Sequence, residues 1–160
     1  MSISKVRDYL SAFGAAERIR EFDTSSATVE LAAAALGTDS ARIAKTLSLS
    51  VPDDAEGCIL IVCAGDVKID NRKFKDRFSH KPKMLSHDEA LALTGHAVGG
   101  VCPFALGPNA RVYLDISLKR FETVFPAAGS SNSAIELTPD ELFEFSGALS
   151  WEDLCKPREA

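Results

Sequence analysis

Two adjacent glycines, Gly99 and Gly100, stand between apolar residues and are followed by Pro103. Glycine permits a positive φ and lets another molecule approach its N–H groups, while proline stiffens the end of a turn. A rigid loop with bare amides can hold a carbonyl oxygen, an oxyanion or a phosphate. A strand that ends in a tight turn explains the same residues. On the loop alone we favour that structural interpretation, because isolated glycine motifs are weak evidence.

Three other features carry residue types suited to chemistry. Lys45 opens a strand-like stretch, where a lysine usually faces solvent but in a groove would suit a phosphate. The loop of small and hydroxyl residues from Ala127 to Ser133 can turn sharply and present donors and acceptors, although a plain hairpin loop has the same composition. His96, beside the glycines, is the histidine that we single out as a candidate for acid–base work.

Neither a catalytic triad nor a metal centre is indicated. No G-x-S-x-G elbow is present, and nothing in the sequence shows that the thiol of Cys102 is activated. The four cysteines form no C-x-x-C motif and no Cys/His cluster, so we expect no metal site and no cofactor. A disulfide framework is not expected in a hydrophobic chain of this length.

The composition is that of a soluble globular protein. The 160 residues suit a single domain spanning 1–160, with 46% hydrophobic and 26% charged residues. The longest apolar runs are far too short to cross a bilayer, and the N-terminus has no signal-peptide pattern. We therefore expect a cytoplasmic protein that has no membrane partner.

The charge is distributed unevenly. A net charge of −5 argues against a generic nucleic-acid binder, yet seven basic residues oppose two acidic ones between Lys68 and Lys83. A local basic face on an acidic domain can contact a phosphate backbone while the remainder is repelled. A solvated helix face explains this segment equally well.

Short strands and helices are interleaved irregularly along the chain. Periodicity, caps and turn residues predict helices near 3–13, 24–37, 70–78 and 86–94, a helix starting at Thr138, and short helical turns after Asp39, Ser117 and Ser150. Strands are predicted near 18–23, 45–51, 58–64, 111–116, 123–127 and 134–137. This order favours an α+β fold, with a mixed sheet or partly closed barrel and helices packed outside.

Three segments, taken in order, resemble the signature of a known family. These are the segments 44–47 (Ala-Lys-Thr-Leu), 98–104 (Val-Gly-Gly-Val-Cys-Pro-Phe) and 128–142, which includes Ile135-Glu136-Leu137-Thr138-Pro139. Each is weak alone, but their order and spacing are similar to those of the YbaK-like family, also called the prolyl-tRNA synthetase-associated or INS-type editing domain. The resemblance runs from the first helix to Leu142. It implies a barrel-like mixed sheet and a free-standing trans-editing deacylase, which hydrolyses the ester joining a wrong amino acid to the 3′ adenosine of a tRNA.

The resemblance also implies roles for individual residues. The lysine matching Lys45 would lie by the tRNA 3′ end, and amides matching Gly99 and Gly100 would hold the aminoacyl carbonyl, with water as the nucleophile. The substrate pocket would comprise Thr24, Ser25, Val29, Val101, Cys102, Pro103, Phe104, Gly129, Ser130, Ser131, Asn132 and Ser133. With the charge pattern, contacts to tRNA are expected at Lys45, Arg72, Lys73 and Lys75.

One departure from the family pattern bears on the substrate. Members that remove cysteine from proline tRNA carry an acidic residue where this chain has Ala134, and a basic pair near Ser130 and Ser131. The small polar loop favours alanine, serine, threonine or 2-aminobutyrate instead. The alternatives are a cysteinyl-tRNA(Pro) deacylase, a non-catalytic module that binds tRNA or a synthetase, and a hydrolase of small aminoacyl esters or nucleotide-binding enzyme.

Overall fold

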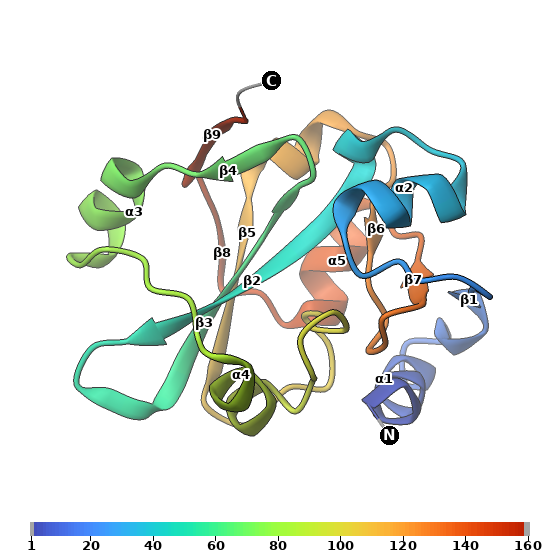
Figure 1. Ribbon diagram of the computed structural model, residues 1–160, viewed down its shortest axis with the longest axis horizontal. Coiled ribbons are helices and arrows are strands. Elements are labelled where there is room, and N and C mark those ends of the chain that lie inside the picture. The colour runs from blue at the N-terminus through green and yellow to red at the C-terminus, as the bar shows by residue number, and fades with distance from the viewer. Residues whose placement is uncertain (1, 159–160) are drawn as a thin grey trace.

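A five-stranded mixed sheet forms the centre of the protein. The computed structural model describes residues 2–158. The sheet has the order β6-β2-β3-β5-β8 (Figure 1). Its antiparallel pair is β2 with β3, and the other three pairs are parallel. The strands are β2 (Ile43–Val51), β3 (Asp54–Ala64), β5 (Ala110–Asp115), β6 (Phe125–Pro126) and β8 (Ser150–Glu152).

Two small sheets extend this centre at its margins. They pair β1 (Ile19–Glu21) with β7 (Ser133–Ile135), and β4 (Val67–Ile69) with β9 (Cys155–Pro157), both antiparallel. Bridges between Val124 and Leu137 and between Ala127 and Ala134 join the β6 edge to the β7 segment, so the strands curl partly around the core (Figure 1). The predicted α+β fold with a barrel-like mixed sheet and outer helices is confirmed.

The helices begin where the sequence offers a cap. Within the described residues they are α1 (Ser2–Ser11), α2 (Val29–Leu36), α3 (Asn71–Phe78), α4 (His87–Thr94) and α5 (Pro139–Ser146), with 3₁₀ helices at Ala16–Arg18, Ser40–Arg42 and Ile116–Arg120. Ser86 and Thr138 each form a complete capping box, and Asp70 accepts two backbone N–H groups. Such caps are worth about 1 kcal/mol each, because they satisfy amides that the helix leaves unpaired.

The hydrophobic core lies around β3. Every residue from Cys58 to Ala64 is buried, as expected for a strand that is covered on both faces. Leu10, Leu60, Leu114 and Leu142 are fully buried in the same cluster, and burial of each contributes about 1.5–3 kcal/mol. β2 is therefore held against a rigid centre. No helix within residues 2–158 has the length and apolar character needed to cross a membrane.

Two sequence predictions about elements are wrong. Ser150 opens strand β8, not a helix, because the strand pairs with β5 and the Trp151 ring stacks on Phe143 with centroids 5.8 Å apart. The second helix begins after Thr28 instead of after residues 24–26. The reason is that the Ser26 N–H donates to the Ser131 carbonyl (2.6 Å), which keeps the preceding chain extended. The three-residue strands β4 and β9 were not predicted, because they are too short to show alternation.

Candidate active site

A cavity of about 530 Å³ lies between β2, α2, the start of α4 and the glycine turn. This volume is in the range of small-molecule binding sites. Most of its wall is aliphatic, with a few hydroxyl groups, one lysine and one histidine. Its lining residues are Ser26–Val29, Ala32, Ile43–Ser48, Met84, Leu85, His87, Val98, Gly99, Val101, Phe125, Ala127, Ser133 and Ala134.

Lys45 lies in the cavity wall with its ammonium group tethered. It is half-buried on β2, opposite Cys63 of β3, and its Nζ donates to the Val67 carbonyl. The Arg120 guanidinium, with a smaller contribution from Lys45, lowers the pKa of the Asp66 carboxyl. The lysine thus provides an ordered positive charge at the cavity, which suits a phosphate or a ribose oxygen.

The glycine turn presents one of its two predicted amides to the cavity. Gly99 lines the cavity with φ +96°, and its N–H has no acceptor within residues 2–158, nor has that of Val101. The N–H of Gly100, however, donates to the Ala97 carbonyl at 3.0 Å. The prediction that Gly100 holds the substrate carbonyl is therefore corrected, because that donor is already used inside the turn.

Gly100 serves instead as the contact between two loops. A Cβ there would lie 2.9 Å from the main chain of Ser130, so a larger residue would push the loops apart. Within the second loop, Ser130 Oγ donates to Ser133 Oγ (2.7 Å), and Asn132 Nδ2 donates to the Phe22 carbonyl (2.9 Å). These bonds fix the shape of the loop that supports the glycine turn.

The cavity collects only part of the predicted substrate pocket. Val29, Gly99, Val101 and Ser133 line it together with Lys45. Thr24 and Ser25 are exposed outside it, and Cys102, Pro103 and Phe104 are buried behind the glycine turn. The remaining loop residues, which support the cavity and do not line it, are Gly129, Ser130, Ser131 and Asn132.

His96 and Cys102 are part of the core beneath the turn. His96 is fully buried, its Nε2 donates to the Phe104 carbonyl (2.7 Å), and its Nδ1 is partnered by the Ser2 hydroxyl. Burial lowers the pKa of His96 and raises the pKa of the Cys102 thiol to about 12. Burial therefore argues against acid–base work by His96 and against a reactive Cys102. Within residues 2–158 no three His, Cys, Asp or Glu side chains gather to hold a metal ion.

Comparison with known proteins assigns the family. The sequence model of the aminoacyl-tRNA editing domain matches residues 23–145, a span that includes the lysine and both loops of the cavity. The chain belongs to the aminoacyl-tRNA editing domain family. The resemblance stated from the sequence is thereby confirmed.

Individual relatives of this editing domain cover most of its length. "Uncharacterized protein YwhH" of Bacillus subtilis (strain 168) is 54% identical over 159 residues, 99% of this chain and 100% of that protein. "Putative Cys-tRNA(Pro)/Cys-tRNA(Cys) deacylase EbsC" of Enterococcus faecalis (strain ATCC 700802 / V583) is 27% identical over 120 residues, 74% of this chain and 72% of the relative. A solved structure described as "a putative trans-editing enzyme for prolyl tRNA synthetase" superposes with TM-score 0.85 at 28% identity, covering 97% of each chain.

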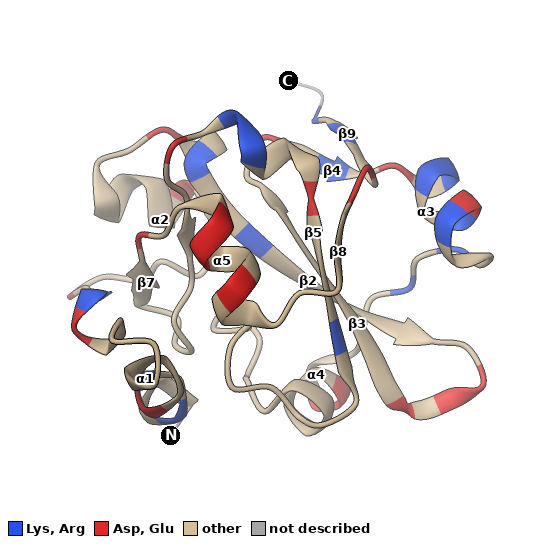
Figure 2. Ribbon diagram, turned by 180° about the vertical axis from the view of Figure 1, so that it is seen from behind, with Lys and Arg blue, Asp and Glu red and all other residues tan. Residues whose placement is uncertain are grey.

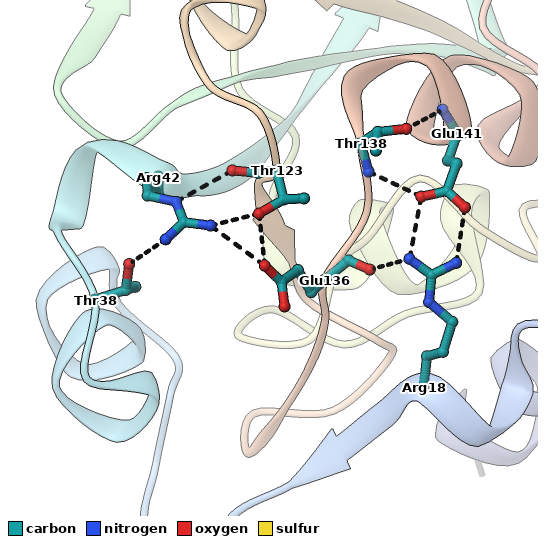
Figure 3. A network of polar contacts seen from close by, with 7 residues as sticks. All are labelled: Arg18, Thr38, Arg42, Thr123, Glu136, Thr138 and Glu141. Atoms are coloured by element: carbon teal, nitrogen blue, oxygen red, sulfur yellow. Dashed lines mark hydrogen bonds and ion pairs between the residues drawn. The ribbon is translucent and has the colours of Figure 1, made fainter.

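A polar network outside the cavity supports one wall of the editing domain (Figure 3). Arg42 donates to the Thr123 carbonyl at 3.2 Å and pairs with Glu136 at 3.3 Å. Its guanidinium also lies 4.9 Å from the ring centroid of Phe125, whose ring contributes to the cavity wall. The network therefore connects the 3₁₀ helix at Ser40–Arg42 to the strand that carries this aromatic residue.

The same network reaches the start of α5. Arg18 forms a bidentate pair with Glu141 (2.7 and 3.0 Å) and donates to the Glu136 carbonyl (2.6 Å), as Figure 3 shows. The Arg18 guanidinium holds the pKa of Glu141 at about 2. Charge-assisted bidentate pairs have a fixed geometry, so this contact orients α5 against the 3₁₀ helix that precedes β1.

The basic segment of the editing domain is only partly available to a partner. Lys and Arg residues gather on α3 (Figure 2), where Arg72 and Lys75 are exposed. Lys73 Nζ instead bonds Asp153 Oδ1 and the Cys155 carbonyl, both at 2.9 Å, and the bond to Asp153 raises the pKa of Lys73. Lys73 therefore joins α3 to β9, which differs from its predicted contact with tRNA.

Sequence reasoning missed several cavity residues of the editing domain. His87 was not singled out from the sequence, yet this exposed residue is part of the cavity lining. Met84 and Leu85 reach the cavity because the chain at 83–85 pairs with β2, a tertiary contact that local sequence does not reveal. Thr46 lies next to Lys45 in the 44–47 segment, which is the one sequence signal that could have pointed to it.

Proposed function

We propose that this protein is a trans-acting aminoacyl-tRNA deacylase that hydrolyses the ester of a mischarged tRNA carrying a small amino acid. The observation that carries the proposal is the meeting of Lys45 and the Gly99 turn at one cavity. Membership of the editing domain family supports aminoacyl-tRNA as the substrate class. The cavity is large enough to take an aminoacyl group with its ribose.

In the proposed reaction, water attacks the ester carbonyl, which the N–H groups of Gly99 and Val101 hold. These donors stabilise the developing oxyanion, and removal of one such donor elsewhere costs about 10²–10³ in kcat. Lys45 positions the ribose or phosphate of the terminal adenosine. The intermediate then releases the ribose oxygen, which leaves as a hydroxyl after taking up the proton lost by water.

The character of the cavity wall supports a small substrate. Ser133, Ala134 and Ala127 line the side beneath the second loop, with Ser26 beside them. We infer alanine, serine, threonine or 2-aminobutyrate as the released amino acid. Cysteine is a second candidate, favoured by the name of the E. faecalis relative. Pockets separate groups that differ by one methylene by only about 1–3 kcal/mol.

The basic face of α3 supports tRNA as the partner. Arg72 and Lys75 are exposed there, and the chain continues through Lys81 and Lys83 to the cavity residue Met84. A phosphate backbone lying along this segment would place the 3′ end near Lys45. Association with a synthetase remains a second proposal, suggested by the description of the solved relative.

A panel of mischarged tRNAs tests the proposal. Proline tRNA charged with alanine, serine, threonine, 2-aminobutyrate, cysteine or proline is incubated with the protein, and loss of the ester is followed over time. Rapid hydrolysis of one small aminoacyl ester, with prolyl-tRNA spared, is expected. Binding of tRNA without hydrolysis of any ester would instead assign the protein as a non-catalytic module.

A further inference from the structure

The outer edge of β2 is covered at both ends but open at one residue between them. Toward its start, Ile43 and Ala44 pair with β6. Toward its end, the Leu85 N–H donates to the Ser48 carbonyl (3.0 Å) and the Ser50 N–H donates to the Lys83 carbonyl (2.9 Å). Residue 46 lies in the interval between these two covers.

The main-chain groups of Thr46 point into that interval. In an antiparallel pair, successive residues direct their N–H and C=O groups to alternate edges. Since Ser48 and Ser50 bond to the 83–85 segment, Thr46 also faces away from β3, where its register partner is Val62. Among residues 2–158, neither its N–H nor its C=O has a main-chain partner on this side. The cavity adjoins this open position of β2, because Thr46 is one of its lining residues.

The side chain of Thr46 is unpartnered as well. Its Oγ1 is the one buried side-chain N or O atom in the described part of the chain that lacks a hydrogen bond. A buried polar atom without a partner costs about 1–3 kcal/mol, so such an atom in a native structure calls for a partner from outside the chain. Three polar groups of one residue are therefore free at one point of a mostly aliphatic wall.

We propose that Thr46 binds the α-amino group of the aminoacyl ester, with its main-chain carbonyl and Oγ1 as acceptors. This inference rests on the proposed deacylase function. An amino group has N–H donors for two acceptors. An acylated nitrogen has a single N–H, so it leaves one of these two acceptors unpaired. The substrate class is thus the aminoacyl-tRNA with a free amine, and N-acylated or peptidyl-tRNA is spared.

Matched substrates and matched variants test the proposal. We compare hydrolysis of alanyl-tRNA with N-acetylalanyl-tRNA by wild type, Thr46→Val and Thr46→Ser. The wild type is expected to prefer the free amine by at least about tenfold, which corresponds to one hydrogen bond of about 1.4 kcal/mol. Thr46→Val should lose most of that preference, Thr46→Ser should lose far less, and Thr46→Val should melt no lower than wild type. Equal hydrolysis of both esters by wild type, or a Thr46→Val enzyme with unchanged preference, overturns the proposal.

A binding measurement separates this proposal from catalysis. The probe is 3′-alanylamino-3′-deoxyadenosine, whose amide replaces the labile ester, and its N-acetyl derivative is the control. Calorimetry should detect binding of the free-amine probe but not of the control. Likewise, the amide resonance of Thr46 should shift with the probe and not with the control. If no mischarged tRNA is hydrolysed but this discrimination holds, the deacylase function fails and the role of Thr46 stands. If both probes bind alike, the role of Thr46 fails even where hydrolysis is seen.

Discussion

The sulfur of Cys102 lies 3.6 Å from Nε2 of His96, yet the two residues form no nucleophile–base pair. Both are fully buried, and Nε2 donates to the Phe104 carbonyl. Burial works against charge on either group, since it raises the pKa of the thiol to about 12 and lowers the pKa of the imidazole. The pair is a structural support for the glycine turn above it.

Replacement of Cys102 by alanine should leave deacylation largely intact. The variant should keep more than half of the wild-type kcat and lose about 1 kcal/mol of stability, because a small cavity remains where the sulfur was. Single-turnover hydrolysis and thermal unfolding measure the two effects. A loss of 100-fold in kcat at unchanged stability would show that the thiol acts in the chemistry.

Stability should fall as the pH is lowered through the range below about 6.5. Burial lowers the pKa of His96 in the folded state below its ordinary value of 6.5, so the unfolded chain binds a proton there that the folded chain does not. The imidazole therefore contributes stability above pH 6.5 that is lost as the pH falls, by up to about 1.4 kcal/mol per unit. Urea unfolding between pH 7.5 and 5 measures the slope. His96→Gln should flatten it, and an identical slope in the variant contradicts the assignment.

Lys45→Ala should reduce kcat/KM on the hydrolysed ester by at least about 100-fold, because it removes the charge that positions the substrate. The change in melting temperature should be small, since the lost partner is a single carbonyl, that of Val67. Lys156→Ala, an exposed lysine on β9, is the matched control. Equal activity of the Lys45→Ala and Lys156→Ala variants would show that Lys45 has no role in the reaction.

Removal of the two exposed charges on α3 should weaken tRNA binding in a salt-dependent way. For Arg72→Ala with Lys75→Ala, the slope of log affinity against log salt should shrink by about 1–2, as expected when two phosphate contacts are lost. Arg111→Ala, exposed on β5, is the control for a lost charge elsewhere. Lys73→Ala should instead lower stability, because its ammonium joins α3 to Asp153 and Cys155. An unchanged salt slope in the double variant would show that these two charges on α3 face solvent and do not contact tRNA.

Local signals in the sequence predicted local structure well. The caps at Asp70, Ser86 and Thr138 start helices as expected, since a cap needs only residues within one turn. Ser150 shows the same type of signal but lies in a strand, because pairing with β5 outweighs a weak helix start. Pairing between distant segments determined that residues 150–152 form a strand, and no pattern in the local sequence predicts such pairing.

Membership of the cavity was less predictable for the same reason. Lys45 and Gly99 were found from motifs, but the difference between Ser133, which lines the cavity, and Ser131, which does not, depends on how the loop folds back on Ser26. The occupied amide of Gly100 depends on a turn geometry that the glycine pair alone does not specify. Motifs therefore located the site, and the fold decided which atoms face it.

The single open position on the edge of β2 also has a consequence for solubility. Strand edges with several free N–H and C=O groups recruit strands from other molecules and promote aggregation. Here β6 covers one side of Thr46 and the 83–85 segment covers the other, so the exposed stretch is too short to template a second chain. The main-chain groups of Thr46 can therefore bind a small ligand, but they cannot pair with a strand from another copy of the protein.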